Sequence, residues 1–175
     1  MKTNILVLFF LVSIVLVSCN NTRKEMSEQE GLRSELLEKE RDLHARTDVD
    51  PEAARAMIGK YIEFVNKYPE DSLSSKYLFK AAEIAMNFEQ PNNSITYLTR
   101  IEDNYPDYEE YGTSLFLKAF IYDNYLKSYE KAEQYYNIFL EKYPDHPFAK
   151  DAKSSLMFLG ISDDDLIKLF EDTDQ

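Results

Sequence analysis

The sequence predicts an all-α protein built from antiparallel helix pairs, and three observations support this class. A pattern of apolar and small residues recurs with a shift of 38 residues between Ser72 and Pro144. Within each copy these residues lie three and four positions apart, which lines one side of a helix. The chain also has no Trp and only four Gly, which favours helices over a turn-rich β fold. A period of this length is typical of stacked helix pairs, and we expect seven to eight helices in total.

Equivalent positions of the two copies define the repeat. The first copy consists of Tyr77, Ala81, Ile84, Ser94, Leu98, Ile101, Tyr105 and Pro106. The second copy consists of Leu115, Ala119, Tyr122, Ala132, Tyr136, Phe139, Tyr143 and Pro144. Each copy therefore closes on the dipeptide Tyr-Pro, where a helix cannot continue.

The first 18 residues are predicted to be a cleaved export signal. Lys2 provides the positive charge that is typical of the N-terminus of an export signal. An apolar run follows at residues 5–17 and is broken only by Ser13. This run is shorter than the ~20 residues that a membrane-spanning helix needs, so an uncleaved anchor is the less favoured alternative. Leu16-Val17-Ser18-Cys19 resembles the lipobox of bacterial lipoproteins, in which the chain is cut before the Cys. The resemblance implies that Cys19 carries acyl chains such as palmitate and that residues 19–25 form a short tether.

Charge and cysteine content exclude several functions. Residues 1–18 carry one Lys and no acid, so their removal changes the net charge from −12 to −13. Such a surface repels phosphate backbones and anionic lipid headgroups, which disfavours nucleic acid as a partner. Membrane attachment must then come from the acyl chains, where each buried CH₂ contributes ~0.8 kcal/mol. Cys19 is the only Cys, so no intramolecular disulfide can form.

The residues after the tether, 26–175, are predicted to form a single helical domain. A charged helix with a narrow apolar stripe is expected over residues 26–46. A half repeat follows at residues 51–69, where Asp50-Pro51-Glu52 gives a capping acid, Pro at the first position and an acid in the first turn. Full repeats are expected at about residues 72–106 and 108–144, with capping helices at 147–172. Within the cap, Gly160 ends one helix and Ser162 begins a last short one.

These repeats resemble tetratricopeptide repeats. That family has an aromatic residue or Leu early in its first helix, a small residue four positions later and Tyr three after that. Its second helix has Ala, then large residues, then Pro. The second repeat matches this order, whereas Ser94 replaces the Ala in the first. The resemblance covers about residues 51–160 and implies a right-handed superhelix of helix pairs.

The ending Phe139 to Asp145, together with the lipobox-like motif, is similar to tetratricopeptide lipoproteins of Gram-negative envelopes, such as BamD and CpoB. This resemblance implies an outer-membrane, lipid-anchored adaptor that faces the periplasm and binds a protein or peptide partner. Exposure on the cell surface remains open. The narrower alternative is an accessory subunit of outer-membrane β-barrel assembly. A fold-level resemblance transfers function poorly.

The same resemblance implies a groove lined by the first helix of each pair, where ligands of the family often lie. Carried over by position, the groove would be lined by Leu78, Ala82, Phe116, Phe120, Asp123 and Asn124. Phe116 and Phe120 lie four positions apart and could hold an apolar side chain of a partner. The alternative is that both rings belong to the core, and the sequence favours this alternative slightly.

The sequence offers no catalytic or metal-binding constellation. His44 and His146 lie in different elements and make no zinc spacing, and His146 is expected to be a solvent-exposed turn residue. The run Asp163 to Asp165 lacks the alternating pattern of a calcium loop. No Gly-rich phosphate loop or nucleophile elbow is present. We therefore expect no enzyme activity, no metal, no cofactor and no small-molecule substrate, with a cell-wall-active enzyme as a remote alternative.

Overall fold

The computed structural model describes residues 23–43, 50–161 and 165. The predicted signal peptide, Cys19 and most of the last predicted helix lie outside these residues. The chain divides into two compact units between Val49 and Asp50, a boundary that falls within the predicted domain of residues 26–175. Each unit is described by itself.

In the first unit, residues 23–43 form one helix. It begins within the predicted tether, so residues 23–25 are helical. Its ion pairs join near neighbours on the helix surface: Arg33 Nη1 lies 3.7 Å from Glu30 Oε2, and Lys39 Nζ lies 3.9 Å from Glu35 Oε1. Exposed pairs of this kind each contribute only a few tenths of a kcal/mol.

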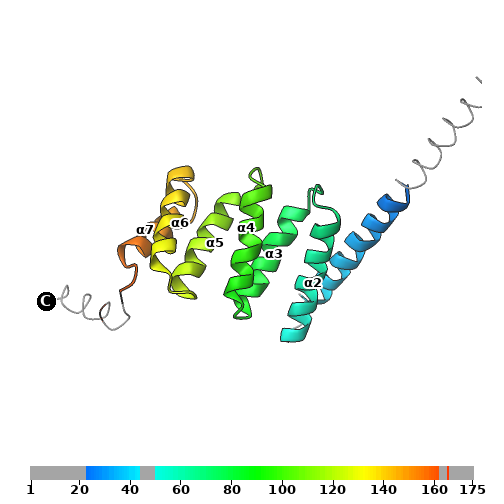
Figure 1. Cartoon of the computed structure of the whole chain (residues 1–175), viewed down its shortest axis with the longest axis horizontal. Helices are drawn as coiled ribbons and strands as arrows, with labels where there is room; N and C mark the ends of the chain where they lie inside the picture. Colours follow the sequence, from blue (N-terminus) through cyan, green and yellow to red (C-terminus); the bar gives the residue numbers. More distant parts are fainter. Residues whose placement is uncertain (1–22, 44–49, 162–164, 166–175) are drawn as a thin grey trace, which may run out of the picture. The chain divides into compact units, whose positions relative to one another are not determined.

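Six helices follow one another along the second unit (Figure 1). They are α2 (Pro51–Lys67), α3 (Ser74–Asn87), α4 (Pro91–Asn104), α5 (Tyr111–Asn124), α6 (Tyr129–Lys142) and α7 (Ala149–Met157). Each packs on the next helix in the chain. The predicted all-α repeat fold is therefore confirmed, with seven helices among the described residues.

Local sequence explains where these helices begin and end. Asp50 caps α2, because its Oδ1 accepts hydrogen bonds from the backbone N–H groups of Glu52 and Ala53, both at 2.8 Å. The helices α2, α4 and α6 all end immediately before a Tyr-Pro dipeptide. Glu89 and Lys127 adopt positive φ angles of 56° and 48° in the turns after α3 and α5.

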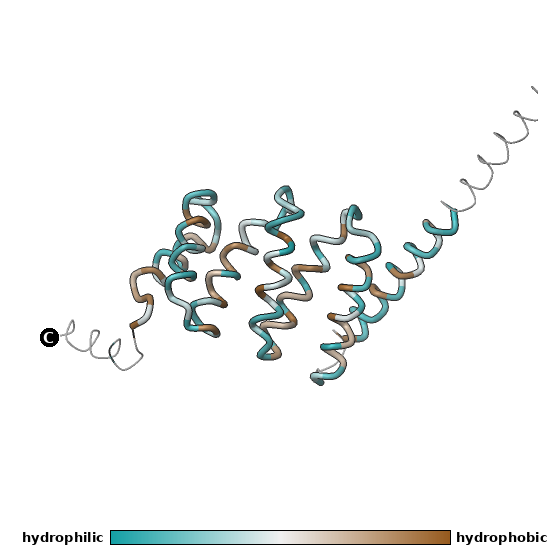
Figure 2. Tube along the Cα trace, viewed as in Figure 1, coloured by the Kyte–Doolittle hydropathy of each residue, from teal (hydrophilic) through white to brown (hydrophobic). Residues whose placement is uncertain are grey.

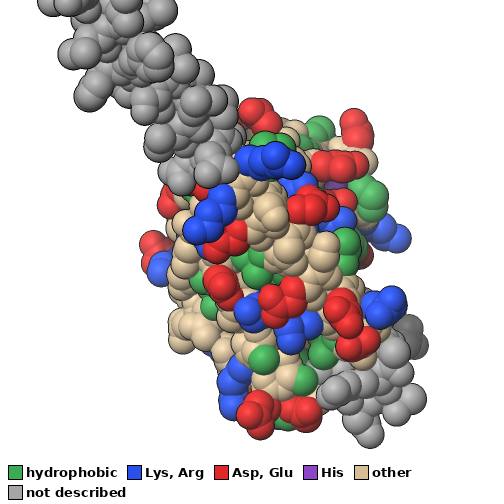
Figure 3. Space-filling model, turned by 90° about the vertical axis from the view of Figure 1, so that its right-hand side faces the viewer, with side chains coloured by type: hydrophobic (Ala, Val, Ile, Leu, Met, Phe, Trp, Pro, Cys, Tyr) green, Lys and Arg blue, Asp and Glu red, His purple; other side chains and the backbone are tan. Residues whose placement is uncertain are grey.

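The core consists of the residues that recur between the repeats. The equivalent residues Ala81 and Ala119 are fully buried, and so are Leu98 and Tyr136. Figure 2 shows apolar residues recurring along each helix between hydrophilic ones. The small residues allow neighbouring helices to approach closely, while the large ones fill the space between them. On the face shown in Figure 3, acidic and basic side chains are interspersed.

Candidate binding site

Four aromatic side chains form a continuous row along α5 to the start of α7. The ring centroids of Phe148 and Phe116 lie 4.8 Å apart and are stacked. The centroid of Phe120 lies 6.5 Å from that of Phe116, and the Tyr125 ring lies 6.1 Å from Phe120. We call these four residues the aromatic row. Phe148 and Tyr125 are 38% and 41% exposed, and the other two rings are half-buried.

Core residues of α6 fix the aromatic row in place. The Phe116 ring lies 6.0 Å from Tyr136 and 5.5 Å from Phe139, both of which are fully buried. One part of Phe116 therefore packs on the core while another part remains accessible. The structure thus combines the two alternatives that the sequence left open for Phe116 and Phe120.

Asp123 and Asn124 continue α5 beyond Phe120. The hydroxyl of Tyr136 donates a long hydrogen bond, 3.5 Å, to Asp123 Oδ2. Burial raises the pKa of the Asp123 carboxyl. The charge of Lys127 and this hydrogen bond lower the pKa, but by less, so the net pKa is raised. Burial also raises the pKa of Tyr136 to about 12. The side chain of Asn124 is exposed, and its Nδ2 donates to the Phe120 carbonyl at 3.1 Å.

Leu78 and Ala82 do not line a groove, and the prediction is wrong for both. Each side chain is fully buried, so neither can contact a ligand. The reason is that α3 packs on both α2 and α4. The buried hydroxyl of Ser94, on α4, donates to the Ala82 carbonyl at 2.8 Å, which shows how closely α4 covers this part of α3.

Tyr125 and Phe148 belong to the row, but the repeat pattern of the sequence does not predict them. Tyr125 follows the last residue of α5, and Phe148 precedes α7, so neither occupies a repeat position. The available signal was an aromatic residue directly after Pro147, at the start of a predicted helix. Their contacts with Phe120 and Phe116 depend on tertiary packing, which periodicity does not report.

His146 differs from the exposed turn residue that the sequence predicted. It is half-buried, and its ring lies 5.2 Å from Phe139 and 5.5 Å from Phe148. Its Nδ1 accepts the backbone N–H of Phe148 at 3.2 Å, and its Nε2 lies 3.3 Å from Thr113 Oγ1. The two ring nitrogens thus contact two different segments, the start of α5 and the residue before α7. His146 therefore helps to hold Phe148 in its place in the aromatic row.

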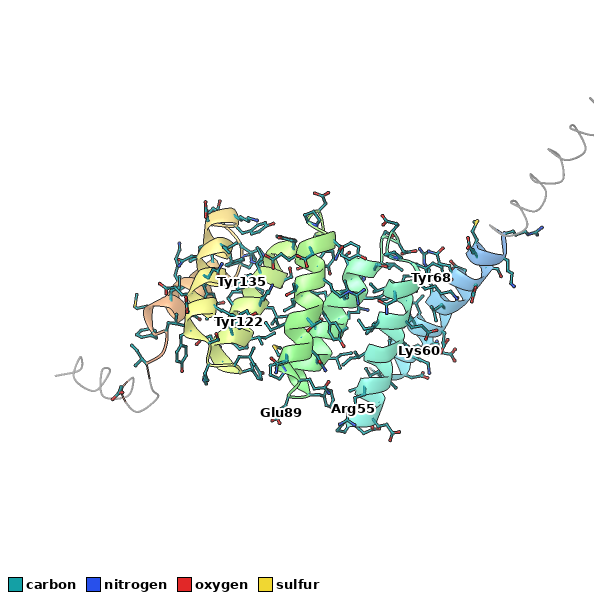
Figure 4. The ribbon with its side chains drawn as sticks, viewed as in Figure 1. Arg55, Lys60, Tyr68, Glu89, Tyr122 and Tyr135 are labelled. Carbon is teal, nitrogen blue, oxygen red and sulfur yellow. The ribbon has the colours of Figure 1, made fainter. Side chains whose placement is uncertain are left out.

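A buried lysine connects the two repeats. Lys118 on α5 is 2% exposed, and its Nζ lies 2.6 Å from Glu102 Oε2 on α4. The same Nζ lies 4.4 Å from the ring centre of Tyr135 on α6. Tyr135 stacks on Tyr122 with a centroid distance of 5.7 Å, and Figure 4 shows these two side chains together.

The ion pair keeps this lysine charged. Burial alone lowers the pKa of Lys118, but hydrogen bonds and charges from Glu102 and Tyr135 outweigh it, so the net pKa is raised. A lysine that acts as a nucleophile or base needs a lowered pKa. The arrangement therefore serves to join α4, α5 and α6.

A pocket of about 440 Å³ lies between the loops that follow α2 and α4. One hydrogen bond joins its walls, in which Tyr105 Oη donates to the Pro69 carbonyl at 2.8 Å. Beside the pocket, Arg100 Nη2 donates to Asn66 Oδ1 of α2 at 2.9 Å. Acidic residues of both loops, including Glu70 and Asp107, also line it. These bonds between neighbouring loops fix the relative positions of successive helix pairs.

Two kinds of feature are absent from the residues that the structure describes. Within these residues, no helix has the length and apolarity required to cross a membrane. The same residues contain no group of three or more His, Cys, Asp or Glu side chains placed to hold a metal ion.

The comparisons with known proteins identify the repeats. The tetratricopeptide repeat family model matches residues 76–108 and 113–146. These stretches contain most of α3 with α4, and then α5 with α6, which are the two hairpins found from the 38-residue period. No curated protein matches the chain. Residues 76–108 and 113–146 are therefore similar to tetratricopeptide repeats, a type that suggests binding of a protein partner.

Proposed function

We propose that this chain is a lipid-anchored adaptor of the cell envelope, which binds a protein or peptide partner at the aromatic row. The observation that carries the proposal is the row itself. It offers partly exposed aromatic rings that the buried side chains of α6 hold in place. Rigid aromatic side chains lose little conformational entropy when they bind, and such residues dominate the energy of many interfaces.

The chemistry of the row defines what the partner should present. Large apolar side chains would pack on Phe116 and Phe120 and remove their remaining exposed area from water. Asp123 lies three positions after Phe120 on the same helix. Its carboxylate can accept a hydrogen bond from the partner or form an ion pair with a basic side chain of the partner. The preferred partner segment is therefore apolar with a neighbouring basic residue.

Membrane attachment is the second part of the proposal and is supported by sequence alone. The apolar run of residues 5–17 and the lipobox-like sequence before Cys19 support acylation and export. Residence in the outer membrane with a periplasmic orientation follows from the resemblance to envelope lipoproteins. Surface exposure is the alternative orientation.

The test is a crosslinked pull-down of the tagged, full-length protein from whole cells. It compares the native chain with the double variant Phe120→Ala/Tyr125→Ala. Tyr97→Ala, on α4, is the matched control, because its ring is half-buried but outside the row. We expect one set of crosslinked proteins that the double variant loses at least tenfold and the control retains. Equal recovery by all three proteins would rule out the row as the binding site.

The same experiment distinguishes the narrower candidate, an accessory subunit of outer-membrane β-barrel assembly. This candidate is supported by the Tyr-Pro repeat ending and the lipobox-like motif together. It requires the barrel-assembly subunits to dominate the recovered proteins in stoichiometric amounts. Another envelope complex in their place would leave the general adaptor function with a different partner.

A further inference from the structure

One side of α7 lacks the cover that equivalent helices have. Counted 37 residues on from Leu115, Ala119 and Tyr122 of α5, the equivalent residues are Ala152 and Leu156 of α7 and Leu159 in the turn after it. The three α5 residues are buried because α6 packs on α5. Of these three equivalent residues, only Ala152 is buried.

The residues of α7 and the turn after it therefore leave apolar area accessible. Leu156 and Leu159 are half-buried. Met157 and Ile161 are 73% and 41% exposed. Within residues 50–161, α7 is the first helix of a pair whose second helix is missing.

We propose that residues 162–175 of the same chain cover this side of α7, in the place that α6 takes on α5. The proposal does not depend on the proposed function. Fourteen residues follow Ile161, and α4 and α6 each have 14 residues. The segment has the apolar residues that such a cover needs, at Leu166, Ile167, Leu169 and Phe170.

The end of α7 directs the chain towards this arrangement. Gly160 has a φ angle of +74°, a conformation that glycine adopts without strain. A Cβ at this position would lie 3.4 Å from the ring of Tyr129, the first residue of α6. The chain thus leaves α7 beside the start of α6. A short segment that continues from this point can cover α7 by running back along it, as α6 runs back along α5.

Charge also favours this occupant. Residues 162–175 contain six acidic residues and one Lys. Exposed Lys150 and Lys153 lie in the first half of α7. An antiparallel course brings the acidic end of the segment, Glu171 to Asp174, towards these lysines. Exposed pairs add little energy, and the other end of the segment, Asp163 to Asp165, is equally acidic, so charge supports the contact without selecting its direction.

Chemical crosslinking between two introduced cysteines tests the placement. In the full chain with Cys19→Ser, we would combine Ser154→Cys, exposed on α7, with Thr173→Cys and add a short bis-maleimide reagent. The matched control replaces Ser154→Cys by Thr96→Cys, which is exposed on α4. We expect an internal crosslink in the monomer for the first pair and none for the control. Crosslinked dimers would instead assign the face to a second copy, and equal reaction of both pairs would overturn the proposal.

Hydrogen exchange gives an independent measurement that keeps the native cysteine. The variant Leu169→Asp/Phe170→Asp should speed exchange of the α7 amides at least tenfold, because the cover is lost. Amides of α3 and α4 should be unaffected, since their contacts lie elsewhere. The matched control Thr173→Asp/Gln175→Asp adds the same charge without removing apolar side chains. Unchanged α7 exchange in the first variant would contradict the proposal.

Discussion

At the scale of single residues, a substitution can test how much the ion pair between Lys118 and Glu102 contributes to stability. Glu102→Gln should lower the free energy of unfolding by about 1–3 kcal/mol, because a buried charge then loses its partner. The lower part of this range is expected, since the Glu102 side chain is 31% exposed. Denaturant unfolding measures the change.

A surface pair supplies the control for this prediction. Lys60 Nζ lies 3.1 Å from Glu63 Oε2, but these side chains are 33% and 52% exposed. Glu63→Gln should therefore cost less than about 0.5 kcal/mol. Equal losses for Glu63→Gln and Glu102→Gln would show that burial of Lys118 adds nothing to the strength of its ion pair.

The carboxyl of Asp123 gives a prediction about pH. Burial raises its pKa in the folded state, so the folded protein binds this proton more tightly than the unfolded chain does. The resulting stability is fully present below the unfolded pKa and is lost as pH rises through the folded pKa. The difference in Tm between Asp123→Asn and the native chain should therefore increase in favour of the variant from pH 4 to pH 7.

Thermal unfolding of both proteins at these two pH values measures the effect. The hydrogen bond from Tyr136 to Asp123 can be retained by the amide oxygen of Asn. A constant difference in Tm between the two proteins at both pH values would contradict the prediction. The same variant would also weaken partner binding if a basic residue of the partner contacts Asp123.

The sequence predicted the residue types of the core better than their exposure. Leu78 and Phe116 occupy equivalent positions in their repeats, yet Leu78 is fully buried and Phe116 is half-buried. Periodicity gives both the same side of the helix. The difference arises from which neighbouring segments cover each helix, and this information is spread over distant parts of the chain.

At the scale of elements, two glycines within helices should respond in opposite ways to Ala. A Cβ at Gly59 in α2 would have no heavy atom within 4 Å apart from those of its own helix and chain neighbours, so Gly59→Ala should stabilise the fold by about 0.5–1 kcal/mol. A Cβ at Gly112 in α5 would lie 3.2 Å from the ring of Tyr143. Gly112→Ala should therefore gain less or become destabilising, because the ring must move.

Thermal melts of these two variants provide the measurement, with each variant acting as the control for the other. A similar gain for both would mean that the contact with Tyr143 imposes no cost. The sequence alone could not separate these glycines, since both lie within predicted helices. The three-dimensional contact between the start of α5 and the Tyr-Pro turn after α6 makes the distinction.

Helix boundaries followed the sequence where local chemistry sets them. The start signal Asp50-Pro51-Glu52 is confirmed, because α2 begins at Pro51 behind the capping Asp50. The second full repeat is predicted to begin at about residue 108, whereas α5 begins at Tyr111 and ends at Asn124. The chain forms turns at Tyr108 to Tyr111 and again after Asn124, and the apolar side chains there made the helical pattern appear to continue.

At the scale of the whole molecule, membrane attachment is the central prediction. Cys19→Ala should move the protein from the membrane fraction to the soluble fraction and abolish incorporation of labelled fatty acid. Acyl chains supply the binding energy, and the acidic chain has no attraction to anionic lipids.

Substitution of a neighbouring residue controls for effects on export. Asn21→Ala keeps Cys19 and the apolar run and should remain acylated and membrane-bound. If Cys19→Ala remained both membrane-bound and acylated, the lipoprotein hypothesis would fail. The aromatic row would then be the proposed binding site of a protein without a lipid anchor.

The contacts of α2 to α7 also determine how the second unit reaches its folded state. Since each helix packs mainly on the next one in the chain, little loop-closure entropy opposes its formation. Folding should start at one hairpin and spread to its neighbours within microseconds to milliseconds, as in other helical proteins with local contacts. During synthesis, the first helix pairs can form their contacts before α7 has been made. The apolar side chains of the incomplete chain are therefore exposed to water only for a short time.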